Sequence, residues 1–401
     1  MLVSLVLVVP ASQIRARGAP AQRFKVERWS AGVLIRFMPM PSTPPQAFDP
    51  LGHALLAKRL AQIPGVLGGM LARGPAPLKP ATLASTRFIV TGTGSSEAHA
   101  RYLTMLLNLH TERAAAYLPL SGFTARLQPA FSGKTLVVFS QGVSPNAQLA
   151  LRRRSDFSHT ILFSATTPAT ALAAGKKDRA ALLQALLDEG GELIEFPLAE
   201  EYTTLIRFVG PMAGYLACLQ FTAQLASCRF KVPAAAAILR QLDAQPPAAL
   251  LDAMQSTPAR FAAGFSLVTA APISEFAQNL ACKFMEGVFW PCPTVSDFLQ
   301  FAHGPFQQTT AHPHPIVILQ GDAPVEAELV GRSLAMLREV GLDAFVIHVD
   351  APPLISIFGF EAALNRLVFT LMPRFGIDQI NWPGKGRDDQ LYGFCPDANA
   401  Q

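Results

Sequence analysis

The chain has 401 residues, half of them hydrophobic and 15% of them charged, which is below the usual charged fraction of about 25%. This composition excludes disorder for the bulk of the chain, and the length allows two or three domains. The net charge of +5 lies entirely in residues 1–40, which hold six basic side chains and one acidic one. The remaining chain is neutral and lacks clustered Lys and Arg with interleaved aromatics, which argues against a nucleic-acid partner.

Residues 1–40 form a basic extension that begins with a largely apolar run of nine residues. The run is too short to cross a bilayer, which takes about 20 residues, and its positive charges follow it instead of preceding it as in a signal peptide. We expect the extension to be disordered outside the fold, or translation to begin at Met38 or Met40. The five cysteines show no CxxC pairing, which argues against a disulfide framework or zinc site and favours a reducing cytoplasm.

From residue 41 the chain reads as a Pro-rich lead-in and helix over 41–75, followed by short β-rich runs that alternate with longer helical ones. The predicted strands are 88–91, 135–139, 159–164, 190–199, 265–269, 315–319 and 343–349. The predicted helices between and after them are 97–110, 146–154, 203–226, 275–289 and 325–341. Strands that alternate with helices predict βαβ units and parallel sheets.

The alternation occurs twice. The first two strands begin about 48 residues apart in the first half (Phe88 and Leu136) and about 51 apart in the second (Phe265 and Ile316). Equal spacing of equivalent elements predicts a duplicated α/β domain. The predicted division is a first domain at 76–232, a helical linker at 233–258, a second domain at 259–390 and a C-terminal tail at 391–401.

Two turns rich in Gly and Ser follow neighbouring predicted strands. The first holds Gly92, Gly94, Ser95 and Ser96, and the second spans 140–146 with the sequence SQGVSPN. Each opens a helix, where free backbone N–H groups and the positive helix end can hold a phosphate. Neither matches a Walker A loop or GxGxxG. Because ligands of open α/β sheets bind at the carboxyl ends of the strands, the two turns are expected to converge on one crevice.

Four segments in order resemble the SIS (sugar isomerase) family over about residues 60–390. They are GTGSSEAHA, SQGVSPNAQLAL, ACKFMEG and FLQFAHGP, at 92–100, 140–151, 281–287 and 298–305. The likeness is greatest to the tandem-domain isomerase half of glucosamine-6-phosphate synthase and to related sugar-phosphate deaminases and deglycases. The resemblance implies two SIS domains, each a doubly wound, flavodoxin-like parallel sheet flanked by helices.

The resemblance also implies a site for a phosphorylated sugar or amino sugar, without a metal or other cofactor. Phosphate and substrate binding fall on Gly94, Ser95, Ser96, Ser140, Gln141, Ser144, Thr203 and Thr204. Glu286 falls on the catalytic base, and Lys283, on the same helix face, falls on the assisting lysine. His303 falls on the ring-opening histidine, which in the family often comes from a second subunit, so a homodimer is implied.

The chain departs from the family pattern at several places. Gly142 and Val143 replace the usual Ser-Gly of the second phosphate loop, which is one residue shorter. The corresponding first loop of the second domain, 269–272, has lost its glycines and serines, so one phosphosugar site per chain is expected. Lys385 follows Pro383 by two residues, closer than the family's C-terminal lysine. No cysteine lies in the first 217 residues, which argues against a glutaminase domain.

Two functions of different class remain open at this point. One is an enzyme that isomerises, deaminates or deglycates a sugar phosphate through an enediol or enolamine. The other is a phosphosugar sensor without catalysis, which the altered loop 269–272 and the displaced Lys385 favour. Taken singly, Glu286 could be a surface carboxylate, Lys283 an ordinary partly buried lysine and His303 a loop brace. A DNA-binding regulator is disfavoured because no helix-turn-helix precedes the first domain, and no membrane partner is expected.

Overall fold

The computed structural model describes residues 50–124, 131–198, 201, 203–226 and 229–394, together with the backbone of three N-terminal strands. The three strands are β1 (Leu7–Val9), β2 (Arg23–Trp29) and β3 (Gly32–Met38). They form an antiparallel sheet in the order β1-β3-β2 within the extension for which the sequence predicts disorder. The Pro-rich stretch 41–49, Cys228, Cys395 and the last residues of the tail lie outside the described residues.

The first half of the body is a five-stranded sheet in which every neighbouring pair is parallel. Its strands are β4 (Arg87–Thr91), β5 (Ala114–Tyr117), β6 (Thr135–Phe139), β7 (His159–Ser164) and β8 (Glu192–Glu195). Their spatial order is β5-β4-β6-β7-β8, which is the 2-1-3-4-5 order of doubly wound, flavodoxin-like sheets. The order reverses between β4 and β6, so the loops after these two strands flank the switch point, where ligands of such sheets bind.

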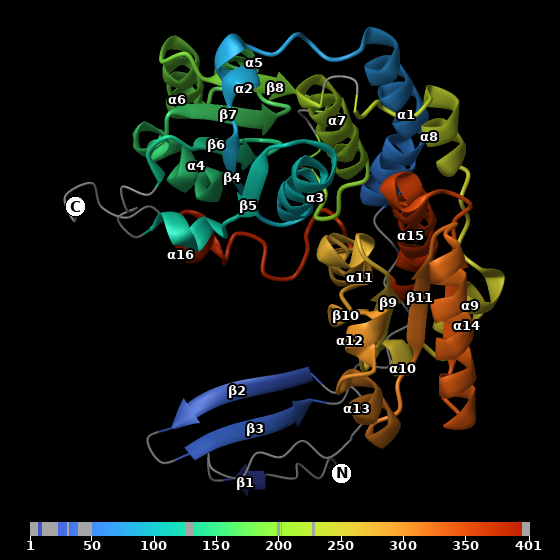
Figure 1. Ribbon diagram of the computed structural model, residues 1–401. Coiled ribbons are helices and arrows are strands. Elements are labelled where there is room, and N and C mark those ends of the chain that lie inside the picture. Colours follow the sequence, from blue (N-terminus) through green and yellow to red (C-terminus); the bar gives the residue numbers. More distant parts are fainter. Residues whose placement is uncertain are drawn as a thin grey trace.

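Helices cover both faces of this sheet (Figure 1). They are α2 (Pro80–Ala84), α3 (Ser95–His110), α4 (Pro145–Arg152), α5 (Pro168–Ala173), α6 (Lys177–Asp188) and α7 (Val209–Leu225), with 3-10 turns at Leu120–Phe123 and Arg154–Asp156. Phe88 and Val90 of β4 pack into the apolar cluster that contains α3 and α7, whereas Ile89 packs into the cluster that contains α4 and α6. A strand buried on both faces is typical of a parallel sheet.

The second half is a four-stranded parallel sheet in the order β10-β9-β11-β12, which repeats the order of the first four strands of the first sheet. Its strands are β9 (Ser266–Thr269), β10 (Thr294–Asp297), β11 (Ile316–Gln320) and β12 (Ala344–His348). Its helices are α11 (Gln278–Val288), α12 (Phe298–Phe301), α13 (Pro305–Ala311), α14 (Pro324–Glu339) and α15 (Pro353–Phe375), with a 3-10 turn at Ile273–Glu275. Two parallel sheets flanked by helices confirm the predicted fold class.

The remaining helices lie before, between and after the two halves in the chain. They are α1 (Pro50–Arg73), α8 (Ala235–Gln241), α9 (Ala248–Ser256), α10 (Pro258–Ala262) and α16 (Asp389–Tyr392). In Figure 1, the segment after α15 runs back to the first half, where α16 lies beside α4. The C-terminal end of the described chain therefore reaches the half that carries the Gly/Ser turns.

One apolar cluster is shared by both halves. It takes Leu103 from α3 and Leu216 from α7 in the first half, and Phe284 from α11 and Leu364 from α15 in the second. Among the described helices, α15 alone is long and apolar enough to cross a membrane, but 78% of its most apolar window is buried inside the protein. Its hydrophobicity is therefore accounted for by a place in the core.

The structure contains elements that were not predicted from the sequence, among them the strands β5 and β10 and the helices α6 and α15, and it shortens one predicted helix. The strand β5 was not predicted, because its sequence Ala-Ala-Ala-Tyr has weak β propensity and occupies a sheet edge. The strand β10 lies within a stretch interrupted by prolines. The helix predicted over 203–226 begins only at Val209, because the backbone N–H groups of Leu205 and Ile206 donate to Gln379 instead of entering a helix.

Candidate functional site

The first Gly/Ser turn joins β4 to α3 at the switch point of the first sheet. A side chain at Gly92 would place its Cβ 2.3 Å from the backbone oxygen of Ser96, so only glycine allows this close approach. Gly94 is the N-cap of α3 with φ +61°, a conformation that favours glycine, and it provides no side-chain cap. The N-terminal turn of α3, with the hydroxyls of Ser95 and Ser96, is therefore open to an anion.

The second turn joins β6 to α4. The N–H of Ser144 donates to Oγ of Ser140 at 3.0 Å, and Ser144 caps α4 by accepting from the N–H of Ala147 at 3.4 Å. Val143 has φ +50° and is completely buried in the apolar cluster under α4. The shortened loop thus bends at a buried valine, and the two serines remain at the start of the helix.

Gln141 and Glu201 organise the start of a third helix, α7. The Gln141 amide donates to the carbonyl of Leu198 at 2.7 Å. The carboxylate of Glu201, which is 2% exposed, accepts hydrogen bonds from the N–H groups of Phe208, Val209 and Gly210, each at 2.7 Å. The N-terminus of α7 is therefore satisfied by an internal carboxylate and does not offer its N–H groups to an external anion.

The two turns open into one cavity of about 560 Å³, which we call the main cavity. Its lining is drawn from both halves of the chain. The predicted residues that line it are Gly94, Ser95, Ser96, Ser140, Gln141, Ser144, Lys283 and Glu286. The helix α11 of the second half thus places its polar face against the Gly/Ser turns of the first.

Glu286 lies on α11 at the wall of the main cavity. Burial raises the pKa of Glu286 to about 7, and the nearby charges of Lys283 and Arg207 oppose this rise. A carboxyl group that titrates near neutral pH can accept and return a proton under ordinary conditions. The site therefore holds a group suited to general acid–base chemistry.

Lys283 lies one helical turn from Glu286 and is buried in an ion pair. Its Nζ is 2.6 Å from Oε2 of Glu361 on α15, and the two side chains are 3% and 0% exposed. Asn279 donates its amide to the other carboxylate oxygen of Glu361 at 2.8 Å. The sequence did not indicate Glu361, because a single Glu within an apolar helix gives no sign of the residue it pairs with.

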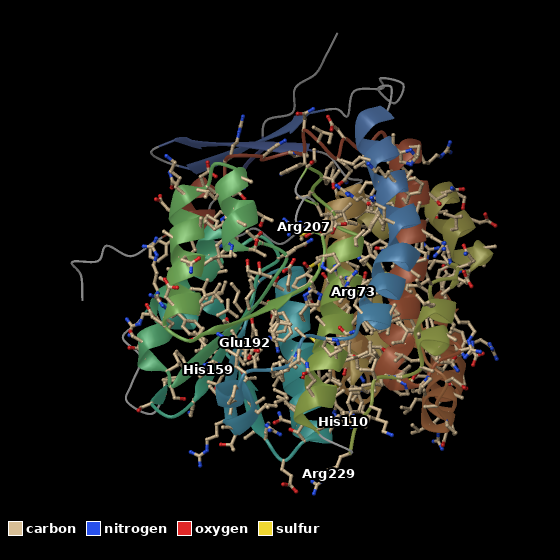
Figure 2. All side chains as sticks on the ribbon, turned by 90° about the horizontal axis from the view of Figure 1, so that it is seen from above. Arg73, His110, His159, Glu192, Arg207 and Arg229 are labelled. Carbon is tan, nitrogen blue, oxygen red and sulfur yellow. The ribbon has the colours of Figure 1, made fainter. Side chains whose placement is uncertain are left out.

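Three further cations line the main cavity, and none of them was predicted as a site residue. Arg207 lies in the loop before α7 (Figure 2). Lys176 and Arg179 lie at the start of α6. Lys176 and Arg179 stand in the sequence GKKDR after a predicted strand, and Arg207 ends the sequence TTLIR. Neither segment resembles a known motif, so the sequence alone did not mark these residues.

Four predicted residues lie outside the lining of the main cavity. Thr203 is exposed, and the Thr204 hydroxyl donates to the carbonyl of Ile206. His303 is exposed between α12 and α13. Lys385 donates to the carbonyl of Ile380 at 2.6 Å. At the rim of the main cavity lies a residue that the sequence did not indicate, Tyr392 of α16.

The chain matches no protein-family model and no curated protein. Solved structures do match it along most of its length. The C-terminal domain of glucosamine-fructose-6-phosphate aminotransferase from Francisella tularensis aligns with a TM-score of 0.63 at 12% identity, over 82% of this chain and 98% of that one. Glucosamine-6-phosphate deaminase from Thermotoga maritima aligns with a TM-score of 0.56 at 13% identity, over 82% of this chain and 96% of that one.

Tagatose-6-phosphate ketose/aldose isomerase from Escherichia coli aligns with a TM-score of 0.52 at 14% identity, over 82% of this chain and 95% of that one. The chain has the tandem SIS fold. The resemblance seen in the sequence is thereby confirmed at the level of fold. At identities this low, the alignments support the arrangement of the elements and leave the chemistry of the site to be argued from its own residues.

Proposed function

We propose that this SIS-fold chain is a phosphosugar enzyme that moves a proton between adjacent carbons of a phosphorylated sugar or amino sugar. The reaction is an aldose–ketose isomerisation, or a deamination or deglycation through the related enolamine. The observation that carries the proposal is the main cavity, which joins the open N-terminus of α3 and the serines of the second turn to Glu286. The proteins of similar fold include a sugar-phosphate isomerase and an amino-sugar-phosphate deaminase, which supports the same class.

The proposed phosphate site lies between the starts of α3 and α4. Ser95 and Ser96 contribute hydroxyls and backbone N–H groups, and Ser140 and Ser144 contribute hydroxyls from the other side. The charged side chains of the lining are four cations, of which Lys283 is already paired with Glu361, and one carboxylate, Glu286. A lining with this balance favours an anionic ligand, and each hydrogen bond to a charged group contributes about 1.5–3 kcal/mol.

In the proposed reaction, the Glu286 carboxylate removes a proton from the carbon beside the carbonyl and returns it to the neighbouring carbon. The negative charge that develops on the enediolate oxygen is stabilised by Arg207 and by the Lys283–Glu361 pair. A base with a pKa near 7 is half ionised at neutral pH, so it can both accept and release the proton within one turnover.

Ring opening is proposed to use His303. This side chain is exposed and lies outside the cavity of its own chain, so in this proposal it serves the site of a second subunit. The proposal therefore includes a homodimer. It also includes a reducing cytoplasm as the compartment, since the described cysteines Cys218, Cys282 and Cys292 are free thiols.

A second candidate function is a phosphosugar sensor without catalysis. Two observations favour it: Lys283 is held in a buried ion pair with Glu361, and His303 is not part of the cavity. A sensor would need only the phosphate site and would leave Glu286 without a chemical role.

Proton exchange separates the two functions. The purified chain is incubated in deuterated water with fructose 6-phosphate, glucosamine 6-phosphate or tagatose 6-phosphate, and deuterium at the carbon beside the carbonyl is followed by NMR. The enzyme is expected to exchange this position with at least one of them, and Glu286→Gln is expected to slow exchange by about 10²–10⁴-fold. Glu339→Gln, an exposed change on α14, is the matched control. Binding without exchange by the unaltered chain would establish the sensor instead.

A further inference from the structure

A second cavity adjoins the main one. It has a volume of about 590 Å³ and shares Pro145, Lys176 and Arg179 with the main cavity. Arg152 and Lys177 complete its charged lining together with one acidic residue, Asp178. We call this the basic cavity, because its charged lining holds four cations and one carboxylate. Two cavities that share three wall residues can be occupied by parts of a single ligand.

Three of the four basic side chains of this cavity, those other than Arg152, lack partners in the described part of the chain. Within the described residues, the side chains of Lys176, Lys177 and Arg179 make no hydrogen bond or ion pair, and Nε of Arg179 is buried without an acceptor. A buried donor without a partner costs about 1–3 kcal/mol, so such groups are rare in folded proteins. An acceptor supplied by a ligand would remove this cost.

Neighbouring basic residues behave differently. Arg153 pairs with Asp156 at 2.7 Å, and Arg154 pairs with Glu189. Both belong to the same Arg-Arg-Arg run as Arg152, so acidic partners are available on this surface. Arg153 and Arg154 thus have acidic partners nearby, whereas the exposed Lys176 and the partly buried Arg179 have none among the residues that the structure describes.

The backbone adds positive potential to the same place. The 12-residue helix α6 begins at Lys177, and its N-cap, Lys176, provides no side-chain cap. The positive end of the helix dipole therefore lies beside the two lysines and Arg179. The helix dipole and the basic side chains are both positive at this place, so an anion is the expected ligand.

The distance between the basic cavity and the proposed phosphate site determines how far apart two anionic groups of one ligand would lie. The helix α4 connects them: Ser144 at its N-cap belongs to the phosphate site, whereas Gln148 and Arg152 line the basic cavity. At 1.5 Å per residue, these positions lie roughly 6 Å and 12 Å along the helix from Ser144. One small ligand can span this separation.

We propose that the basic cavity binds a second anionic group of the ligand, so that the substrate is a phosphosugar that carries a further phosphate or a carboxylate. The inference rests on the proposed function, because it takes the first phosphate to lie at Ser95, Ser96, Ser140 and Ser144. Arg179 and Lys176 lie on the shared wall and contact the second anion, and Arg152 and Lys177 surround it. The shared chemistry is an oxyanion, which either a phosphate or a carboxylate can supply.

The test compares three probes by isothermal titration calorimetry: glucose 6-phosphate, glucose 1,6-bisphosphate and 6-phosphogluconate. The unaltered chain is expected to bind at least one of the last two about tenfold or more tightly than glucose 6-phosphate, as one charge-assisted hydrogen bond would give. Preference for the bisphosphate identifies a phosphate as the second group, and preference for 6-phosphogluconate identifies a carboxylate. Arg179→Gln and Lys176→Gln are expected to reduce this preference toward onefold, and Arg338→Gln, on the exposed end of α14, is expected to preserve it.

The outcomes separate this inference from the function on which it rests. If glucose 6-phosphate binds, Ser95→Ala and Ser140→Ala weaken it, and neither ligand with two anionic groups binds more tightly, the second anion site is refuted and the phosphosugar site stands. If a ligand with two anionic groups still binds more tightly than glucose 6-phosphate to both Arg179→Gln and Lys176→Gln, the second anion site is also refuted. If none of the three probes binds, the proposed function fails and the inference fails with it.

Discussion

The ammonium group of Lys283 lies 2.6 Å from the carboxylate of Glu361, and both side chains are removed from solvent. The two residues come from α11 and α15, so the pair joins the helix that carries Glu286 to the central helix of the core. Burial raises the pKa of Glu361, and the charge of Lys283 opposes that rise. The pair therefore fixes a cation at the cavity wall by means of a carboxylate behind it.

Glu361→Gln is expected to destabilise the chain by about 3–5 kcal/mol, because it leaves the Lys283 ammonium buried without its counter-charge. Chemical denaturation followed by circular dichroism measures the change. The double variant Lys283→Met/Glu361→Leu is expected to recover most of the loss, since replacing both members of a buried pair by apolar residues is often neutral. A loss below about 1 kcal/mol, the range of exposed ion pairs, would show that the pair is hydrated.

Glu286 gives the proposed reaction a pH dependence with a defined sign. Its pKa is raised to about 7, so the carboxylate that removes the proton is lost as the pH falls below 7. The exchange rate is expected to rise with pH to a plateau, with its midpoint near pH 7. A rate that is constant between pH 5 and 8 would remove Glu286 from the role of base.

The same pKa shift affects stability. The unfolded chain ionises Glu286 near its ordinary pKa of 4.5, whereas the folded chain retains the proton up to about 7. The unfolded state therefore binds fewer protons in this window, so folding stability falls as the pH rises from 4.5 through 7. Glu286→Gln lacks this dependence, and its melting temperature relative to the unaltered chain is expected to increase from pH 4.5 to pH 8. If the difference in melting temperature between Glu286→Gln and the unaltered chain were the same at pH 4.5 and pH 8, the raised pKa would be contradicted.

Glu201 is expected to be required for the start of α7. Glu201→Ala leaves three backbone N–H groups buried without an acceptor, which is expected to cost roughly 3 kcal/mol. Glu201→Gln keeps one acceptor oxygen and is expected to cost less. Urea denaturation compares both with Glu195→Ala, at the exposed end of β8, which is expected to change little. Equal stability of the alanine and glutamine variants would mean that water replaces the carboxylate.

The proposed contribution of His303 to a second subunit can be tested by mixing two inactive variants. Glu286→Gln lacks the base, and His303→Ala lacks the ring-opening group. In a mixed dimer, one site has both defects and the other has neither, so random mixing is expected to restore about a quarter of the unaltered activity. Size-exclusion chromatography establishes whether the mixture is dimeric. Dimeric mixtures without any recovered activity would place His303 outside the partner's site.

Much of the fold could be predicted from the sequence because the local signals agree with the tertiary structure. Buried parallel strands such as β6, with the sequence Thr-Leu-Val-Val-Phe, read as strands from hydrophobicity and β-branching alone. The edge strand β5 gave no such signal, because three alanines pair with β4 only when the rest of the sheet is present. The late start of α7 depends on Gln379, which is 173 residues away from Ile206 in sequence and invisible to any local pattern.

Some residues of the candidate site could likewise be predicted from the sequence, and others could not. The Gly/Ser turns could be found because Gly92 and Gly94 are dictated by local backbone geometry, and Glu286 because it lies in a segment that resembles a family motif. The cations Lys176, Arg179 and Arg207 gain their meaning only from their place in the folded chain. Lys283 was predicted as a site residue, but its partner Glu361 follows it by 78 residues, and only the packing of α11 against α15 brings them together.

The apolar cluster that joins α3 and α7 to α11 and α15 forms one continuous core between the two halves, although each has its own sheet. The hydroxyl of Tyr102 in α3 donates to the carbonyl of Leu354 in α15 at 2.8 Å, so polar contacts cross the same boundary. A fragment that carried one half alone would expose this interior to water and invite aggregation.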